Sequence, residues 1–346
     1  IKKKRGKRMK RLKVSLLIFV LSLGALLAAC GNDEASTSGD GKAADTVRLG
    51  YFPNLTHIST IIALEKGFFE AELGEDIELK KQTFPDGGAF MEAMSTDNID
   101  VGTVGPTPVL NSYTKNPAHQ ILAGAVSGGA VLVVREDSGI ESIADLAGKR
   151  VAIPTIGSTQ DIMLMKSLKD AGLEVKSSGG TVETLKQAPA DTAALFLQKD
   201  IDAAATQEPW GVNLETNANA KVLLDANEFG WGEDSTNTVF VGTNKFIEAN
   251  PELTQKILKA HVEAINYINE NKEEAIELFI GHIKEITGKE LSLEEVTKAM
   301  DRTIPTYEIN EDVLQEMATI SKDAKYINSD NIDGLLNTEL LSEVLK

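Results

Sequence analysis

Cysteine is almost absent from this chain, which has a single one, Cys30, among 346 residues. One cysteine cannot form an intramolecular disulfide, and it leaves the remainder of the chain without a thiol nucleophile. A free cysteine is usually buried as a small hydrophobe. Cys30 instead ends an apolar run and precedes a polar stretch, where no core could cover it. Its position therefore indicates a role other than packing or catalysis.

Histidines and catalytic motifs are equally scarce. The four histidines are His57, His119, His261 and His282, and their spacing is not that of metal ligands. The sequence contains no G-x-S-x-G, no H-E-x-x-H and no phosphate-binding P-loop. We therefore expect no metal, no cofactor and no catalytic residues.

Basic residues are concentrated at the start of the chain. Residues 1–13 carry nine Lys or Arg and no acid, and residues 14–29 are all apolar or small. A membrane-spanning helix needs about 20 apolar residues, whereas a basic segment followed by a shorter apolar run is typical of a secretory signal. The sequence therefore predicts a signal over residues 1–29. An uncleaved N-terminal anchor is the alternative, and both place the remainder of the chain outside the cytoplasm.

The end of this segment explains the lone thiol. Leu27-Ala28-Ala29-Cys30 resembles the lipobox of bacterial lipoproteins. The resemblance implies cleavage before Cys30, acylation of its sulfur and a lipid-anchored protein on the outer side of the cell membrane. Residues 30–45 are rich in Gly, Ser, Asp and Ala, so we expect a flexible tether there.

The mature protein would be strongly acidic. Without the leader, 26 basic residues would face 52 acidic ones, a net charge of −26 over 317 residues. Such a charge disfavours binding to nucleic acid or to an anionic membrane surface. About 300 ordered residues are enough for a large core, which usually divides into two parts.

From residue 46 onward, strand-like and helix-like segments alternate. The sequence predicts strands at 47–52, 77–84, 99–105, 121–126, 130–136, 150–154 and 238–243, most of them followed by a helix. After residue 250 the pattern is helical to the end. Strands that alternate with helices indicate an α/β fold with mostly parallel sheets.

Five segments then carry a specific resemblance. In order they are GYFPNLTHISTIIALEKGFF, IDVGTVGPTPVL, IADLAGKRVAIPTIGSTQDIMLMKSLKDAGL, APADTAALFLQKDIDAAATQEPW and VFVGTNKFIEANPEL. Their order and spacing resemble the substrate-binding proteins of ABC importers for nitrate, aliphatic sulfonates, taurine and thiamine pyrimidine precursors. The resemblance implies a type II periplasmic-binding-protein-like fold with two α/β lobes and a helical C-terminal region. We expect one lobe over 46–128 plus 240–346 and the other over 129–239.

Three strand-to-helix turns are the candidate site. In open α/β sheets, ligands bind at the carboxyl ends of strands, and free N–H groups at a helix start attract anions. The turns follow the strands at 47–52, 99–105 and 150–154, and the Gln-Glu-Pro-Trp segment ends a further strand. The predicted ligand-binding residues are Phe52, Asn54, Thr56, His57, Pro106, Thr107, Ser127, Gly157, Ser158, Thr159, Gln160, Glu208 and Trp210.

For two of these residues, the sequence leaves two roles possible. Trp210 is either a wall of the cleft or a core residue, with the wall favoured because family members often have an aromatic here. Glu208 would pair with the ammonium of a solute such as taurine, or turn away to a backbone donor or a lysine if the solute is a plain anion. We favour the plain anion, because an acid before this proline recurs in relatives whose solutes lack amines.

The resemblance implies a solute-binding lipoprotein, acting as a monomer, that delivers a small solute to an ABC permease and, through it, to the ATPase. An aliphatic sulfonate is the expected solute. Nitrate, taurine and a thiamine pyrimidine precursor are the alternatives within this role. An enzyme similar to the pyrimidine synthases of this fold is the alternative from another class, and the absence of a catalytic cluster argues against it.

Overall fold

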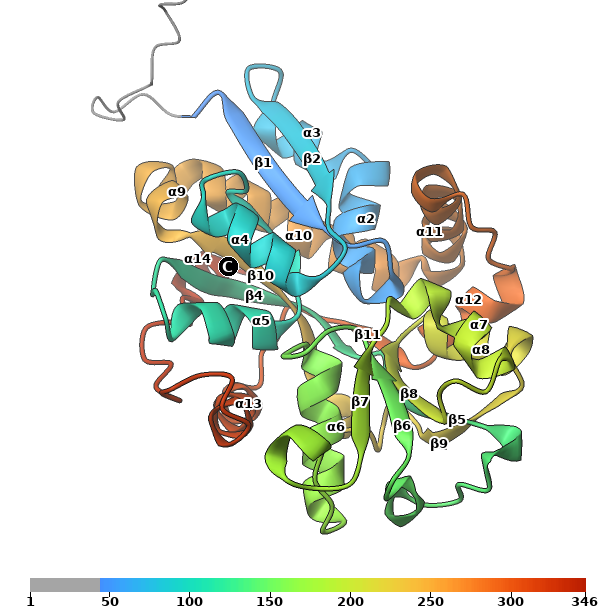
Figure 1. Cartoon of the computed structure of the whole chain (residues 1–346). Coiled ribbons are helices and arrows are strands. Elements are labelled where there is room, and N and C mark those ends of the chain that lie inside the picture. Colours follow the sequence, from blue (N-terminus) through green and yellow to red (C-terminus); the bar gives the residue numbers. More distant parts are fainter. Residues whose placement is uncertain (1–43) are drawn as a thin grey trace, which may run out of the picture. The chain divides into compact units, whose positions relative to one another are not determined.

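The computed structural model describes residues 44–346, so the predicted signal, Cys30 and the first part of the predicted tether lie outside the described residues. The described chain forms two β-sheets with helices on their faces (Figure 1). The first sheet has the order β11-β4-β10-β3-β1-β2, and its strands are β1 (Thr46–Tyr51), β2 (Glu78–Thr83), β3 (Val101–Val104), β4 (His119–Gly128), β10 (Thr236–Thr243) and β11 (Thr303–Pro305).

The second sheet has the order β7-β6-β8-β5-β9. Its strands are β5 (Ala130–Arg135), β6 (Arg150–Ile153), β7 (Glu183–Lys186), β8 (Ala203–Gln207) and β9 (Ala220–Leu224). The predicted α/β class is confirmed, but both sheets are mixed rather than mostly parallel. β2, β1 and β3 pair in parallel, as do β7, β6 and β8, because a helix or long loop returns the chain between them. The other pairings are antiparallel.

The helices cover both faces of each sheet. They are α2 (Ile58–Glu65), α3 (Phe68–Leu73), α4 (Gly87–Ser95), α5 (Pro106–Tyr113), α6 (Thr159–Asp170), α7 (Thr192–Leu197), α8 (Trp210–Asn217), α9 (Asn244–Ala249), α10 (Pro251–Glu270), α11 (Lys272–Thr287), α12 (Leu293–Met300), α13 (Glu311–Asp323) and α14 (Glu339–Val344). No helix among residues 44–346 is long and apolar enough to cross a membrane.

The sequence predicted a wholly helical C-terminal region, and this prediction is wrong. Thr303–Pro305 forms β11, which pairs antiparallel with β4. Strands β7 and β9 were also not predicted. Both are short and only partly buried, so they lack the continuous apolar pattern that marks a buried strand.

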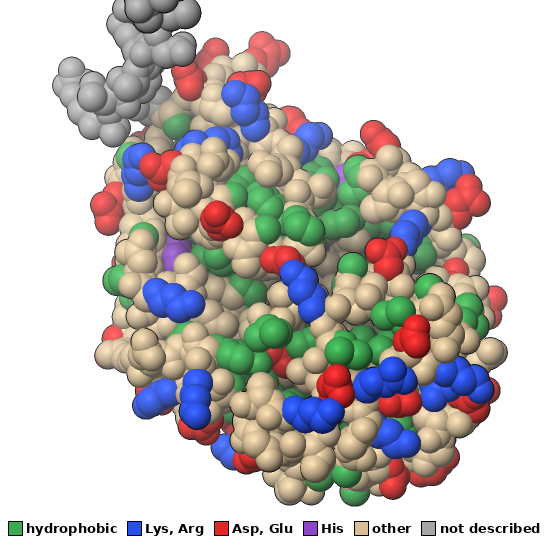
Figure 2. Space-filling view, in the orientation of Figure 1, with side chains coloured by type: hydrophobic (Ala, Val, Ile, Leu, Met, Phe, Trp, Pro, Cys, Tyr) green, Lys and Arg blue, Asp and Glu red, His purple; other side chains and the backbone are tan. Residues whose placement is uncertain are grey.

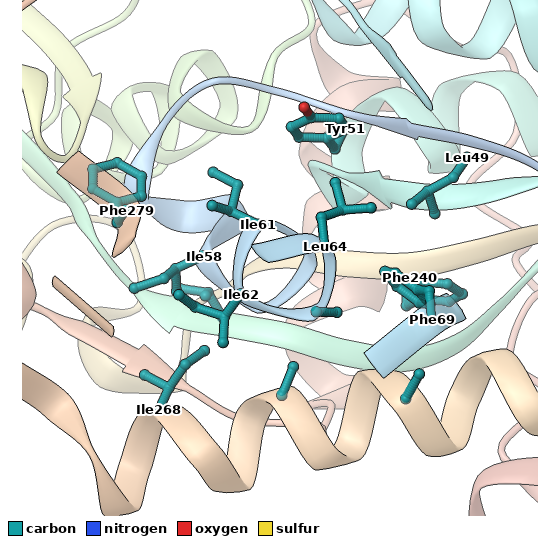
Figure 3. Packing of buried hydrophobic residues seen from close by; sticks show 14 of the residues in the cluster. Leu49, Tyr51, Ile58, Ile61, Ile62, Leu64, Phe69, Phe240, Ile268 and Phe279 are labelled. Atoms are coloured by element: carbon teal, nitrogen blue, oxygen red, sulfur yellow. The ribbon is translucent and has the colours of Figure 1, made fainter. Parts of the chain in front are cut away.

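The core beneath the first sheet is built from α2 and α10. Ile58, Ile61 and Ile62 of α2 are fully buried. Ile58 and Ile62 face α10, which contributes Ile268, and Ile61 lies on the side of α2 away from α10 (Figure 3). The same face includes Phe240 of β10. Burial of each such side chain contributes about 1.5–3 kcal/mol, so this layer fixes α2 and the loop before it against the sheet.

The chain crosses between the sheets at two glycines. β4 ends at Gly128, and β5 begins directly after Gly129. Both glycines have positive φ, 65° and 69°, which a residue with a side chain rarely adopts. The chain returns to the first sheet between β9 and β10.

Candidate functional site

A pocket lies where the carboxyl ends of strands from both sheets meet. It encloses about 510 Å³, including space open to solvent. Its lining residues follow β1, β2 and β3 of the first sheet and β6, β7 and β8 of the second, and the start of β10 completes it. They are Phe52, Asn54, Thr56, His57, Pro85, Asp86, Gly87, Gly105, Pro108, Pro154, Thr155, Ser158, Thr159, Gln160, Pro189, Gln207, Asn237 and Thr238.

The loop after β1 contributes a compact polar group. Asn54 caps the following turn, because its Oδ1 accepts hydrogen bonds from the backbone N–H of Thr56 at 3.1 Å and from the Thr56 hydroxyl at 2.6 Å. The ring of His57 stacks at a tilt on Phe52, with 4.8 Å between ring centroids. Burial lowers the pKa of His57 to about 3, so this imidazole is neutral at physiological pH.

Three lining side chains have buried polar atoms without a partner among the described residues. They are the hydroxyls of Thr159 and Thr238 and the amide oxygen Oε1 of Gln207. Leaving such a buried group unpaired costs about 1–3 kcal/mol. Thr159 and Gln207 belong to the second sheet's side and Thr238 lies on β10 of the first, so unpaired groups border the pocket from both sheets.

The pocket has one charged lining residue, Asp86, and no Lys or Arg among the described residues. Asp86 caps α4 by accepting from Ala89 N–H at 3.0 Å, and its other oxygen lies 3.1 Å from Lys186 Nζ, at the end of β7. Although burial opposes it, these two partners lower the pKa of Asp86. Its charge is therefore compensated by Lys186, across the pocket from α4.

The start of α6, which follows β6 of the second sheet, carries several polar side chains. Ser158 is the N-cap, and its Oγ accepts from Asp161 N–H at 3.3 Å. The carboxylate of Asp161 turns back to accept from Gly157 N–H at 2.8 Å and from the Tyr326 hydroxyl at 2.9 Å, while its Oδ1 has no partner among the described residues. Burial raises the pKa of Asp161 to about 6, against these two donors.

Asp161→Asn is expected to stabilise the protein at pH 8 by about 1–2 kcal/mol, because it removes a buried, incompletely paired charge. The favourable position of an anion at a helix start reduces the gain. The folded pKa is raised, so the penalty in the wild type is full above about pH 6, shrinks as the pH falls and vanishes below the unfolded value of 3.8. Urea unfolding between pH 4 and 8 measures this convergence.

Asp145 is the matched control. Like Asp161, it lies in the first turn of a helix, here the short 3-10 helix Ile143–Leu146, but it is exposed. Hydrogen bonds from the backbone N–H of Glu141 and from the side chain and backbone N–H of Ser142 lower its pKa. Asp145→Asn should therefore destabilise the protein at pH 8, with the opposite sign. A destabilising Asp161→Asn at pH 8 would contradict the assignment.

The structure brings seven of the predicted residues together around the pocket: Phe52, Asn54, Thr56, His57, Ser158, Thr159 and Gln160. Pro106 and Thr107 form the first turn of α5, but Pro108 and Gly105 line the pocket in their place. Gly157 borders an adjacent groove, and Ser127 borders a groove near β11.

Glu208 and Trp210 lie outside the pocket. The carboxylate of Glu208 is fully buried and accepts from Val212 N–H at 3.0 Å and from Arg302 Nη1 at 2.8 Å. Glu208 thus turns away to a backbone donor, as expected for a plain anionic solute, and its ion partner is an arginine rather than a lysine. Trp210 packs in the core beneath the first sheet, with Lys289 Nζ 5.4 Å from its ring centroid.

Sequence reasoning missed the part of the pocket from β2 and β10. Asp86 follows a strand and caps a helix, the same signal that identified the other turns, so it could have been found. Asn237 and Thr238 come from the start of an antiparallel strand, which carries no such signal. Among residues 44–346, no group of three or more His, Cys, Asp or Glu could hold a metal ion.

The chain matches the model of the NMT1-like family over residues 40–280. It is 29% identical over 281 residues to a Bacillus subtilis (strain 168) protein whose name assigns it to aliphatic sulfonate binding, covering 79% of each chain. It is 28% identical over 206 residues to the taurine-binding periplasmic protein of Escherichia coli (strain K12), covering 59% of this chain and 61% of the relative.

Solved structures share the fold. The alkanesulfonate-binding protein SsuA from Xanthomonas axonopodis pv. citri, bound to MOPS, superposes with a TM-score of 0.71 at 21% identity, covering 84% of this chain and 96% of that one. The periplasmic nitrate-binding protein NrtA from Synechocystis PCC 6803 superposes with a TM-score of 0.72 at 17% identity, covering 88% and 89%. These similarities confirm the periplasmic-binding-protein-like fold.

Proposed function

This chain belongs to the NMT1-like family, and from that premise we propose that it captures a small oxyanion, an aliphatic sulfonate, and delivers it to an ABC permease. Its relatives are solute-binding proteins of ABC importers in the sulfonate, nitrate and taurine group. The observation that supports this proposal most directly is the pocket. It is walled by hydroxyls, amides and a neutral histidine at the carboxyl ends of strands from both sheets.

The charges favour a plain anion over an amino-sulfonate. Glu208, the acid that could have paired with an ammonium, is bound to Arg302 and lies outside the pocket. Asp86 is compensated by Lys186. An ammonium in the pocket would therefore have to displace an existing ion pair, whereas a sulfonate would meet uncharged donors.

The mechanism we propose is closure of two lobes around the solute. We keep the predicted lobes, residues 46–128 plus 240–346 and residues 129–239, except that the second boundary falls before β10, because the whole of this strand pairs in the first sheet. The two chain crossings between the sheets support a division of this kind. Acidic and basic side chains are interspersed over the face in Figure 2, around a more apolar middle. The permease would dock on both lobes and receive the solute as they part.

A thermal-shift screen with ethanesulfonate, taurine, nitrate and an aminopyrimidine tests the solute. A ligand at 100 times its Kd stabilises the folded state by about 2.7 kcal/mol. We expect the largest shift with ethanesulfonate. A larger shift with the aminopyrimidine would contradict the proposal, and conversion of ethanesulfonate, followed by mass spectrometry, would indicate an enzyme instead.

We also propose that Cys30 carries lipid and that the mature protein is anchored outside the cytoplasm. The support is the Leu27-Ala28-Ala29-Cys30 stretch after a basic and apolar leader. Cys30→Ser should move the protein from the membrane fraction to the medium or leave an uncleaved precursor. An unmodified Cys30 in mature wild-type protein, found by mass spectrometry, would refute the anchor.

A further inference from the structure

His57 is held at the pocket by a chain of two hydroxyls that the proposed function does not require. Its Nδ1 lies 2.8 Å from Thr103 Oγ1, and Thr103 Oγ1 lies 2.9 Å from Thr60 Oγ1. Thr103 is on β3 and Thr60 is on α2, and both are fully buried. We call Thr60, Thr103 and His57 the hydroxyl relay.

Hydrogen counting fixes the direction of the relay. Among the described residues, Thr60 Oγ1 has no hydrogen-bond partner except Thr103 Oγ1, so the Thr60 hydrogen must be donated there. Thr103 Oγ1 then accepts from Thr60, and its own hydrogen is donated to His57 Nδ1. If His57 donated from Nδ1 instead, one of the two threonine hydrogens would be left buried and unpaired, which native interiors avoid.

We propose that the hydroxyl relay locks His57 as the neutral tautomer protonated at Nε2, so that this N–H is a fixed donor for an oxyanion in the pocket. A neutral imidazole has one donor and one acceptor nitrogen, and the partner of one sets the role of the other. Nδ1 is the acceptor, so Nε2 donates. Among the described residues Nε2 has no partner, and His57 lines the pocket.

The tautomer separates the candidate solutes by chemistry. A sulfonate or nitrate oxygen accepts from Nε2–H, whereas an aminopyrimidine presenting its amino group there would place two donors against each other. The opposite tautomer would favour the aminopyrimidine. This inference rests on the proposed function for the ligand, while the tautomer itself is a property of the free protein. Thr60 and Thr103 are accordingly positioning residues.

Burial keeps the donor uncharged. Desolvation is the cause of the lowered pKa of His57, and Asp86, the one charged group lining the same pocket among the described residues, is paired with Lys186. Asp161, next to the lining residues of α6, has a pKa of about 6 and would itself change anion affinity in this range, so the test uses the Asp161→Asn background. There the affinity for a permanently ionised sulfonate should stay constant from pH 8 to pH 5. An imidazolium donor would instead give an affinity that rises as the pH falls through about 6.5.

The experiment combines nitrogen NMR of the histidine rings with calorimetry on ethanesulfonate. In the ligand-free wild type, with His57→Gln used for assignment, Nε2 should have the shift of a protonated nitrogen and Nδ1 that of an unprotonated one. Thr103→Val should lose the single tautomer and weaken ethanesulfonate binding about 10- to 100-fold, as expected for loss of a hydrogen bond to an anion. Thr103→Ser, which keeps a hydroxyl at this position, should retain both the single tautomer and the wild-type affinity.

The outcomes separate this inference from the proposed function. A proton on Nδ1 in the wild type would overturn the relay, as would unchanged ethanesulfonate affinity in Thr103→Val. If His57 is protonated at Nε2 and ethanesulfonate does not bind, the tautomer stands and the proposed solute is wrong.

Discussion

Arg302→Met is expected to lower the free energy of unfolding by about 3–5 kcal/mol, the range for breaking a buried ion pair by removing one partner. Arg302 donates to Glu208 at 2.8 Å and to Glu215 at 2.6 Å, and its Nε lies 2.8 Å from Asp225. After the substitution, Lys298 still pairs with Glu215 and solvent reaches Asp225. Glu208 alone, fully buried, would lose its only ion partner among the described residues.

A second substitution isolates this cause. Adding Glu208→Gln to Arg302→Met removes the stranded charge and should recover most of the lost stability in urea or thermal unfolding. Arg150→Met is the matched control, because Arg150 is paired with Asp202 but is 40% exposed, and such a pair contributes about 0–1 kcal/mol. A loss at Arg302 no larger than that at Arg150 would contradict this account.

The position of Glu208 gives this ion pair a further consequence. The backbone N–H of Glu208 donates to Gly129 at the chain crossing, and its carbonyl accepts from Leu55 N–H in the loop after β1. Arg302 itself accepts from Gly129 N–H through its carbonyl oxygen. The backbones of Glu208 and Arg302 are therefore bonded to the chain crossing, and that of Glu208 also to the loop after β1. Breaking the side-chain ion pair should therefore also loosen the loop that carries His57.

The sequence was sufficient at two of the turns where a strand ends at a capped helix, whereas the same signal at Asp86 was missed. The turn at Ser158 combines a capping hydroxyl with a well-formed helix, and the turn at Asn54 combines a capping amide with a buried helix, so both could be placed at the edge of a sheet. Local signals of this kind depend on neighbours within four residues. Two of the three predicted turns accordingly contribute side chains to the pocket, and the third contributes through Gly105 and Pro108.

The sequence was insufficient where the decisive partner is distant. Glu208 is 94 residues from Arg302, and nothing local indicates that an arginine before a short strand will neutralise it. Thr238 reaches the pocket because β10 runs antiparallel between β3 and β4, an arrangement set by the chain crossing rather than by nearby residues. Trp210 is in the core because its helix α8 packs against α12, far along the chain.

Thr159→Val combined with Thr238→Val is expected to weaken ethanesulfonate binding at least about 100-fold without loss of stability. Both hydroxyls line the pocket, are buried and have no partner among the described residues. A hydrogen bond to a charged group contributes about 1.5–3 kcal/mol, so two of them account for about 3 kcal/mol or more, and each 1.4 kcal/mol is tenfold. Valine keeps the shape and removes an unpaired buried hydroxyl, so the free protein should be as stable or slightly more stable.

Thr206→Val distinguishes this result from a general effect of valine. Thr206 lies on β8 next to Gln207, and its hydroxyl is also buried and unpartnered among the described residues, but it does not line the pocket. Its replacement should have the same small effect on unfolding and no effect on calorimetric affinity. If the Thr159 and Thr238 variant binds ethanesulfonate as the wild type does, the solute does not occupy this pocket. A loss of affinity confined to the two pocket threonines, with the same small effect on stability at all three positions, would instead place the anion between α6 and β10, because hydroxyls that cost stability in the free protein are retained when they serve a ligand.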